Sequence, residues 1–335
     1  MNFLVIGLGS IGKRHTKNLL DLGVPASNIM GVDTRDDRLD EARALGIEKL
    51  YKSHKQALES CEVDAAILCS PTSLHIEQGI ELAQNGVHLM IEKPLAHNLD
   101  GIDKFVDEVE KNQIKVLMGY IFRFSPLTQK VINLLKNNEI GKILYFRGEF
   151  SEYLPDWHKY EDYRSFYMAK KSQGGGSILD QSHIFDLAHY FFGSFEKVFA
   201  FNSKISDLEI NADDIAELFV VMKSGVIGSL HTDIFGRSHK KYLEIKGENG
   251  NIMWDFYGNS VTHYDAKSSK LSVYDDFEED FNKTYINEMK HFIECCEMNK
   301  EPIASLDDGI ETMELILSSE KSHETNKIEF LGENE

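Results

Sequence analysis

Apolar runs alternate with amphipathic segments over roughly the first 120 residues of the chain. Short runs that are apolar on both faces predict buried strands at residues 3–6, 29–32, 65–69, 87–91 and 116–119. The segments between them have the length and spacing of helices, at residues 13–22, 38–45, 75–84 and 99–111. Buried strands that alternate with helices are typical of a parallel sheet covered on both sides. The pattern therefore predicts an α/β domain with a doubly wound parallel sheet.

Alternation with a period of two becomes dominant after residue 123. It is clearest in the segments KILYFRGEF, KVFAFNSKI, IAELFVVMKSGVIGSLHTDIF and KKYLEIKGENGNIMWDF, and it predicts strands with one buried face. The turns KSGV, at 223–226, and GENG, at 247–250, predict hairpins within these segments. Two final helices, near residues 280–298 and 306–319, are expected to cover or return toward the first domain. We therefore expect a first domain at 1–122, followed at 123–335 by an α+β domain with a large, mainly antiparallel open sheet.

Composition and charge narrow the function classes. The chain has 335 residues, enough for about two domains of ~150 residues each. Its net charge of −19 would repel a phosphate backbone, so general binding to nucleic acid or to anionic membranes is not expected. No apolar run approaches the ~20 residues of a membrane helix, and no charged leader segment precedes the first strand. The four cysteines form no C-x-x-C pair, which fits a reducing compartment, and we expect a cytoplasmic protein.

The sequence GLGSIG follows the first predicted strand and opens a helix. It places Gly7, Gly9 and Gly12 in G-x-G-x-x-G spacing. Gly7 permits a tight turn, Gly9 lets the backbone approach a pyrophosphate, and Gly12 lets the helix pack closely on the strand. Ser10 and Ile11 lie at the helix N-terminus, where free N–H groups and the helix dipole attract phosphate oxygens. A glycine turn that binds nothing is the alternative, but the flanking strand and helix favour a dinucleotide site.

Asp33 closes the second predicted strand, roughly twenty residues after the glycines. An acid at this position would accept hydrogen bonds from the adenosine ribose hydroxyls and would repel a 2′-phosphate, which favours NAD over NADP. Arg35 and Arg38 leave NADP open as the less favoured cofactor, because a nearby guanidinium can pair with that phosphate or stack on adenine. We expect NAD, with Arg38 among the residues that contact it.

Polar residues follow two further strands at their carboxyl ends, where open parallel sheets bind their ligands. These segments are LCSPTSLH, at 68–75, and IEKP, at 91–94. Charged residues and a proline also end strands that have no function, but both segments fall at the ligand-binding edge of the predicted sheet. We expect Lys93 to point into the crevice beside the nicotinamide. The other residues expected to contact the cofactor there are Ser70, Pro71, Thr72, His75 and Glu92.

A third motif, GGGSILDQSHIFD, spans residues 174–186. Asp180 and His183 stand at positions i and i+3 and would share one face of a helix. A carboxylate at this distance can orient an imidazole and stabilise its protonated form, which suits a base that takes a proton from an alcohol. A surface aspartate and a buried, satisfied histidine are the alternative. No cluster of residues has metal-ligand spacing, so we expect no metal.

An aromatic and basic segment, SEYLPDWHKYEDYR, spans residues 151–164 and has no clean periodicity. A packed surface loop is one interpretation. The other is a substrate-binding segment, because aromatic faces stack on sugar or base rings and arginine forks bind phosphate or carboxylate. The candidate substrate-binding residues are Arg123, Trp157, Tyr160, Tyr163 and Arg164, with Tyr153 beside them.

The ordered set GLGSIG, SPTSLH, EKPLA, RFSP and GGGSILDQSH resembles the glucose–fructose oxidoreductase/inositol dehydrogenase/rhizopine-catabolism (Gfo/Idh/MocA) family over nearly the whole chain. The resemblance implies a Rossmann-like dinucleotide domain followed by an α+β domain for substrate binding and oligomerisation. It also implies that Lys93 lies beside the nicotinamide and helps to handle the substrate hydroxyl proton. Members often have a cis bond before the proline, which would be Lys93–Pro94. The segment 151–164 resembles members associated with nucleotide-sugar and surface-polysaccharide metabolism.

The third motif departs from the family pattern. Many members carry the histidine four residues after the aspartate, whereas His183 follows Asp180 by three. A subset carries the shorter form, usually followed by Glu, where this chain has Ile184. The shift would turn the imidazole by roughly 100° around the helix axis. Asp186 is therefore kept as a second candidate for the proton acceptor.

Together, the residues and the resemblance predict an NAD-dependent oxidoreductase that acts on a hydroxyl of a sugar or sugar derivative. Two arginines among aromatic residues favour an anionic or nucleotide-linked sugar. His183 would exchange the hydroxyl proton, Lys93 would stabilise the developing alkoxide, and Asp180 would hold the imidazole. Two alternatives stay open: tightly bound NAD used for transient oxidation in a net non-redox or substrate-to-substrate reaction, and a non-catalytic sensor. The open sheet face predicts a homodimer or a dimer of dimers.

Overall fold

The structure is a computed structural model that describes residues 1–157, 162–277 and 280–332. The chain forms two compact units, each with its own sheet. The N-terminal unit contains Met1–Ile121 and Phe281–Gly309, and the C-terminal unit contains Phe122–Asp280 and Ile310–Glu335. The division at residues 122 and 123 is kept as a proposal for the domains, with the addition that the segment from Phe281 to Gly309 clusters with the N-terminal unit.

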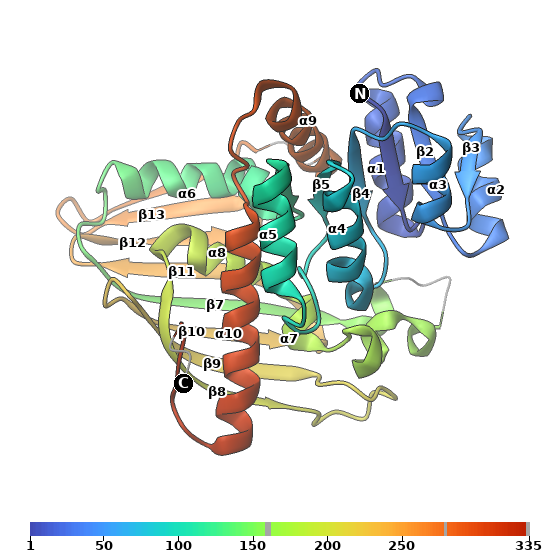
Figure 1. Ribbon diagram of the computed structural model, residues 1–335. Coiled ribbons are helices and arrows are strands. Elements are labelled where there is room, and N and C mark those ends of the chain that lie inside the picture. The colour runs from blue at the N-terminus through green and yellow to red at the C-terminus, as the bar shows by residue number, and fades with distance from the viewer. Residues whose placement is uncertain (158–161, 278–279, 333–335) are drawn as a thin grey trace. The chain divides into compact units, whose positions relative to one another are not determined.

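The N-terminal unit is built on a six-stranded parallel sheet with the order β3-β2-β1-β4-β5-β6 (Figure 1). Its strands are β1 (Phe3–Ile6), β2 (Ile29–Val32), β3 (Lys49–Tyr51), β4 (Ala65–Leu68), β5 (His88–Ile91) and β6 (Val116–Met118). Its helices are α1 (Ser10–Asp21), α2 (Asp36–Ala44), α3 (His54–Ser60), α4 (His75–Gln84), α5 (Ile102–Asn112) and α9 (Asn282–Met298). The strand order reverses between β1 and β4, which confirms the predicted doubly wound α/β fold.

The apolar runs predicted five of these six strands. Every residue of β1, β2 and β4 is buried, which explains why these strands are apolar on both faces. The sequence analysis missed β3 and the helix α3 that follows it. β3 has three residues at the edge of the sheet, and because none of them is buried, it carries no hydrophobic pattern.

Helix α9 packs against α1 and thereby completes the N-terminal unit. Asn282 donates its side-chain N–H to Asn18 Oδ1 at 3.0 Å. The ring of Tyr285 meets His15 edge-on, with 6.0 Å between the ring centroids, and the Arg14 guanidinium lies 4.5 Å from the centroid of the same tyrosine. The expected return of a late helix to the first unit is therefore confirmed for α9.

The C-terminal unit is built on a nine-stranded sheet with the order β14-β13-β12-β11-β7-β10-β9-β8-β15 (Figure 1). Its strands are β7 (Ile143–Tyr153), β8 (Phe195–Ser203), β9 (Ile215–Met222), β10 (Ile227–Asp233), β11 (Phe235–Gly247), β12 (Gly250–Asp255), β13 (Ser260–Asp265), β14 (Lys270–Tyr274) and β15 (Glu329–Phe330). Its helices are α6 (Pro126–Lys136), α7 (Ser177–Asp180), α8 (His183–Phe192) and most of α10 (Leu306–Thr325). Neighbouring strands run antiparallel except β7 and β10, which confirms the predicted, mainly antiparallel sheet and both of its hairpins.

Helices cover one face of this sheet. α6 packs on β12 and β13, α7 on β9 and β10, and α8 on β7. α10 packs on β8, where the Ala200 N–H donates to Ser322 Oγ at 3.0 Å. On the opposite face, alternate side chains remain exposed. The apolar ones are Phe199, Phe201, Phe219, Ile227, Tyr264, Leu271 and Val273.

An ion-pair network also lies on this open face. His231 Nδ1 is 2.7 Å from Glu217 Oε2, and its Nε2 is 2.9 Å from Asp233 Oδ2. Partial burial alone would lower the pKa of His231, but hydrogen bonds to the two carboxylates and their charges outweigh burial and raise the pKa to about 9. At neutral pH the imidazole is therefore protonated and donates to both carboxylates.

Stability should depend on pH through His231. A histidine whose pKa is raised in the folded state stabilises fully below its unfolded pKa of about 6.5, and this contribution is lost as the pH rises through about 9. We expect the free energy of unfolding of the wild type to exceed that of His231→Gln at pH 6, and the difference to disappear by about pH 10. Denaturant titrations at the two pH values measure it. An advantage that does not change with pH would contradict the assigned charge.

Candidate active site

The glycines of the GLGSIG motif form the turn between β1 and α1. Gly7 has φ of +89°, a left-handed conformation that glycine adopts without strain, and its N–H donates to Val32 O at 2.8 Å. A Cβ atom on Gly7 would lie 2.5 Å from the carbonyl oxygen of Cys69. One on Gly12 would lie 1.8 Å from the carbonyl oxygen of Gly7. Neither position has room for a side chain, as the motif requires.

Gly9 faces open space instead. A Cβ atom there would meet nothing closer than the Arg38 guanidinium, at 3.5 Å. Helix α1 begins at Ser10, and no side chain caps its first N–H groups. An uncapped helix N-terminus beside an open glycine fits the pyrophosphate of a dinucleotide. Gly9, Ser10 and Ile11 are therefore placed to contact the pyrophosphate, and Arg38 lies beside Gly9.

Asp33 is fixed at the end of β2 and is 6% exposed. Its Oδ2 accepts the Leu8 N–H at 2.8 Å, and its Oδ1 accepts the Arg35 N–H at 2.9 Å. The Arg38 guanidinium lies 3.4 Å from Oδ2. The carboxylate is therefore held beside the glycine loop, where its remaining acceptor capacity suits ribose hydroxyls and its charge opposes a 2′-phosphate.

This geometry predicts a preference between the two nicotinamide cofactors. We expect calorimetry to show tighter binding of NADH than of NADPH, because a 2′-phosphate would approach the Asp33 carboxylate. Asp33→Ser should narrow the gap by removing that charge. Equal affinities in the wild type would contradict the prediction and would point to Arg35 or Arg38 as phosphate ligands.

His75 joins the loops that follow β4 and β5. Its ring is 1% exposed; Nε2 lies 3.0 Å from Ser70 O, and Nδ1 lies 3.2 Å from the carbonyl oxygens of Pro94 and Leu95. Burial lowers the pKa of His75, and the hydrogen bonds to the backbone of Ser70, Pro94 and Leu95 oppose this shift. The Lys93–Pro94 bond is cis, as the resemblance implies. His75 thus braces the lysine segment and has no nitrogen open to a cofactor.

The other predicted contacts in these loops differ in exposure. Pro71 is exposed, whereas Thr72 is buried. Ser70 Oγ donates to Gln78 Oε1 at 2.6 Å. Glu92 Oε1 lies 2.8 Å from the Nε2 atom of the buried His15, a residue that the sequence analysis did not select.

The helix predicted to carry Asp180 and His183 is broken between them. α7 ends at Asp180 and α8 begins at His183, with a turn at Gln181 and Ser182. Gln181 anchors this turn by donating its side-chain N–H to the buried Glu152 at 3.1 Å. The prediction of one continuous helix was therefore wrong, and the rotation expected from regular helical spacing does not apply.

Two aromatic residues contact the pair within the C-terminal unit. Tyr167 donates its hydroxyl to Asp180 Oδ1 at 3.0 Å, and Asp180 is 7% exposed. Phe122 meets the His183 ring edge-on, with 4.9 Å between centroids. These contacts fix the carboxylate and the imidazole on neighbouring turns. Neither Tyr167 nor Phe122 could be selected from the sequence, because neither belongs to a motif.

Arg123 and Asp186 form a buried ion pair with each other. Their side chains are 2% and 1% exposed, and the guanidinium donates from Nε at 3.0 Å and from Nη2 at 2.7 Å to Asp186 Oδ1. The face of Tyr190 covers the guanidinium at 4.6 Å. Arg123 was predicted to bind an anionic substrate and Asp186 was kept as a second proton acceptor. This contact gives each charge a partner, and both assignments stay predictions.

The described aromatic residues of segment 151–164, together with Tyr167 just after it, pack onto a small core. Tyr153, Trp157, Tyr163 and Tyr167 lie against a buried cluster formed by Leu154, Phe166, Met168, Leu208 and Ile234. Arg164 is exposed and pairs with Asp162 and Glu209. Tyr160 lies outside the described residues. The described part of this segment therefore packs against a core, and Tyr167, which follows the segment, supports Asp180.

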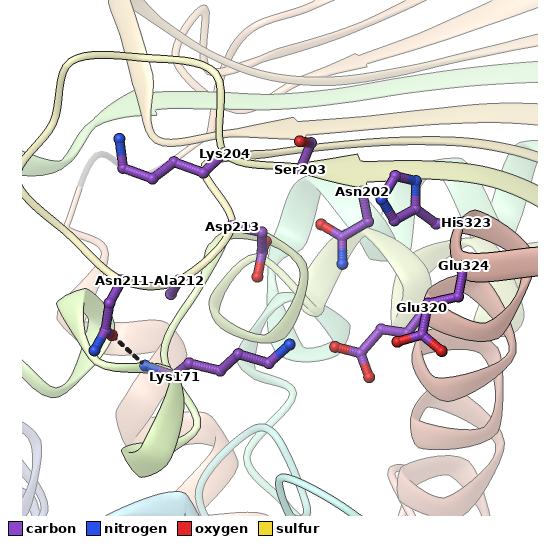
Figure 2. A pocket seen from close by; sticks show the side chains of 10 residues that line it. All are labelled: Lys171, Asn202, Ser203, Lys204, Asn211, Ala212, Asp213, Glu320, His323 and Glu324. Carbon is purple, nitrogen blue, oxygen red and sulfur yellow. Dashed lines mark hydrogen bonds between the residues drawn. The ribbon is translucent and has the colours of Figure 1, made fainter.

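A cavity of about 410 Å³ lies behind α7 in the C-terminal unit (Figure 2). Asp213 lines it; its carbonyl oxygen accepts the Ser177 N–H, and its Oδ2 accepts the Ile178 N–H at 2.9 Å. Burial raises the pKa of Asp213 to about 6. Lys171 and Glu320 point toward one another across the cavity (Figure 2). The cavity thus adjoins the residues that hold the first turn of α7 and, with it, Asp180.

Within the described part of the chain, no helix is long and apolar enough to cross a bilayer. The same residues contain no group of three or more His, Cys, Asp or Glu side chains arranged to hold a metal ion.

Family profiles match both parts of the chain. Residues 1–120 match a Gfo/Idh/MocA profile described as an oxidoreductase family with an NAD-binding Rossmann fold. Residues 132–330 match the corresponding C-terminal alpha/beta domain. The two matches follow the order of the two parts of the sequence.

Curated relatives are similar over nearly the full length. The chain is 31% identical to myo-inositol 2-dehydrogenase of Thermotoga maritima, over 98% of this chain and 97% of the relative. It is 30% identical to scyllo-inositol 2-dehydrogenase (NAD(+)) of Bacillus subtilis, over 95% and 92%. Among solved structures, the WlbA dehydrogenase of Bordetella pertussis, in complex with NADH and UDP-GlcNAcA, has a TM-score of 0.87 at 21% identity, over 100% of this chain and 98% of that one. This last likeness concerns the fold.

Proposed function

Because the chain belongs to the Gfo/Idh/MocA oxidoreductase family, we propose that it oxidises one ring hydroxyl of a neutral cyclic polyol or sugar, using NAD. The enzyme class is that of the NAD(P)-dependent sugar and polyol dehydrogenases, which act on CH–OH groups. The cofactor is NAD, which fits the open Gly9, the uncapped start of α1 and the fixed Asp33 carboxylate.

The residues of the chain divide the work of an alcohol oxidation. When bound, NAD supplies the acceptor for the hydride that leaves the carbinol carbon. His183 takes the hydroxyl proton on its imidazole, and Lys93 donates a hydrogen bond to the same oxygen as negative charge develops there. Asp180, held by Tyr167, orients the imidazole and favours its protonated form. In the reverse direction the same groups return the proton to the carbonyl oxygen.

The neutrality of the substrate rests on one observation. Both arginines that favoured an anionic sugar are already paired with carboxylates, Arg123 with Asp186 and Arg164 with Asp162 and Glu209. Neither guanidinium therefore offers a free charge. Two curated relatives, 31% and 30% identical to this chain, are named for inositols, which are neutral.

A comparison of substrates tests this proposal. We expect NADH formation with neutral inositols or pyranoses to have a higher kcat/KM than with uronates or nucleotide-linked sugars. The matched variant Arg164→Ala should leave the ratio of the two kcat/KM values unchanged. A preference for the anionic substrates would overturn the assignment to neutral polyols and would leave the dehydrogenase class intact.

A second candidate is the anionic or nucleotide-linked sugar of surface-polysaccharide metabolism. One observation favours it: the exposed Arg237 guanidinium lies 3.7 Å from the centroid of the Tyr153 ring. Among the described residues, no carboxylate forms an ion pair with Arg237. If this candidate is correct, Arg237→Ala should lower kcat/KM for the anionic sugar and leave that for its neutral parent unchanged.

The open face of the C-terminal sheet is the proposed site of homo-oligomerisation. Phe199, Phe201, Phe219 and Ile227 form an apolar patch on neighbouring strands, and Phe219 is 57% exposed. Patches of this kind on soluble proteins are usually covered by a partner, and a second copy covers it symmetrically.

Four free cysteines fit a reducing compartment, and the cytoplasm remains the proposed location.

Light scattering at micromolar concentration should therefore give a dimer or a tetramer. Phe219→Glu should shift the protein toward the monomer, because a charge would be buried in the interface. The control is Met298→Glu, which places the same charge at an exposed apolar residue of α9, in the N-terminal unit. A monomeric wild type, or equal effects of the two substitutions, would contradict this interface.

A further inference from the structure

A buried hydrogen bond between His15 and Glu92 connects the dinucleotide loop to the segment of Lys93. His15 lies on α1, three residues beyond Gly12, and its side chain is fully buried. Its Nε2 is 2.8 Å from Glu92 Oε1, and the Glu92 side chain is 13% exposed. Glu92 immediately precedes Lys93. All these residues belong to the N-terminal unit.

Glu92 is restrained on its other side as well. Its Oε2 accepts the backbone N–H of Lys93 at 3.3 Å. A Cβ atom on Gly119, just after β6, would lie 3.1 Å from both Oε2 and Cα of Glu92, so the backbone there already approaches closely. The carboxylate thus lies between the imidazole of α1 and the backbone of Lys93, with little space to rotate.

None of the other four titratable groups described around Glu92 is favoured in a positively charged form that would pair with its carboxylate. They are Cys69 and His75 from the loops after β4, and Tyr285 and Glu288 from α9. Burial and the Glu92 charge raise the pKa of Cys69, Tyr285 and Glu288, while burial lowers that of His75, so each shift disfavours the charged form of its group. Arg14 lies over the ring of Tyr285. His15 is therefore the buried side-chain donor that fixes the carboxylate.

We propose that His15 is a positioning residue that, through Glu92, holds the backbone of Lys93 in register with α1. α1 and Lys93 would then move as one body. α1 is the helix that receives the pyrophosphate at its N-terminus, and Lys93 is the residue that would meet the substrate hydroxyl. The role assigned to Lys93 rests on the proposed function; the mechanical link between His15 and the lysine backbone does not. A purely structural histidine would contribute volume and stability only.

The first test measures the link without any substrate. Hydrogen–deuterium exchange followed by mass spectrometry reports on the Lys93 N–H, which donates to Glu92. His15→Phe keeps an aromatic ring but removes the donor, and should speed this exchange by about tenfold or more, with or without NADH. His15→Gln keeps a donor near the position of Nε2 and should restore slow exchange. Glu288→Gln is the matched control, since it changes a buried polar group on α9 that does not bond to Glu92 in the structure and should leave the exchange as in the wild type.

The second test measures turnover with whichever sugar the wild type oxidises. His15→Phe should lower kcat by about tenfold while KM and the NADH dissociation constant stay within about threefold, and His15→Gln should recover most of kcat. If the wild type oxidises no sugar, the proposed function fails and the exchange measurement still decides the link. Unchanged Lys93 exchange in His15→Phe overturns the proposal. The proposal is also overturned if His15→Gln behaves like His15→Phe in both measurements. It is overturned as well if His15→Phe lowers the melting temperature but changes neither the Lys93 exchange nor kcat.

Discussion

Replacing Lys93 by methionine is expected to reduce turnover by about two powers of ten or more, and His183→Ala should have a similar effect. Methionine keeps the length of the lysine side chain but has no proton to donate to the substrate oxygen. Alanine at position 183 removes the imidazole that is proposed to accept the hydroxyl proton. Steady-state rates of NADH formation with saturating substrate measure both losses.

Cofactor binding provides the control for both variants. The residues assigned to the pyrophosphate and the ribose, Gly9, Ser10 and Asp33, are unchanged in either one, so calorimetry should give an NADH affinity close to that of the wild type. Tyr167→Phe, which removes the hydroxyl bonded to Asp180, should lower the rate less than His183→Ala does. A His183→Ala variant that keeps most of its activity would show that another group accepts the proton.

Arg123→Ala is expected to have the largest effect on stability. The guanidinium and the Asp186 carboxylate are almost completely buried and bonded to each other. Removing one partner of a buried ion pair leaves the other charge uncompensated, which costs about 3–5 kcal/mol of folding free energy. Asp186→Ala should cost a similar amount, for the same reason. Denaturant titrations followed by circular dichroism measure the loss.

Arg164→Ala is the matched control for this prediction. Arg164 also contacts two carboxylates, Asp162 and Glu209, but all three side chains are exposed. Exposed ion pairs contribute little to stability, so this variant should unfold close to the wild-type midpoint. An Arg123→Ala variant with wild-type stability and a raised KM for anionic sugars would restore the original assignment of Arg123 to the substrate.

The sequence predicted the N-terminal fold well because burial there is two-sided. β1, β2 and β4 are buried throughout, and a run of apolar residues records that directly. The glycine turn could also be predicted, because Gly7 and Gly12 leave no room for a Cβ atom and so must be glycine. β3 could not be predicted from an apolar run, because none of its three residues is buried.

Side-chain pairing could not be predicted in the same way. Arg123 and Asp186 are 63 residues apart, and nothing in the sequence distinguishes an arginine that binds substrate from one that is buried against an aspartate. The contact between Tyr167 and Asp180 depends on a loop without periodicity. His15 and Glu92 are 77 residues apart and meet only because the loop after β5 returns to α1. Such partners become visible once the sheet order is known.

Hydride transfer from a polyol carbon to NAD is the central claim, and one measurement tests it most directly. The protein is mixed with NAD and with inositol that carries deuterium at its ring carbons or hydrogen at the same positions, and absorbance is followed at the reduced-nicotinamide band. We expect net NADH formation, one equivalent per ketone produced, and a slower rate with the deuterated substrate when hydride transfer limits the rate. The contradicting result is the absence of net NADH with every neutral or anionic sugar under conditions where the cofactor binds. If sugar is nevertheless consumed, NAD is held tightly and used for a transient oxidation.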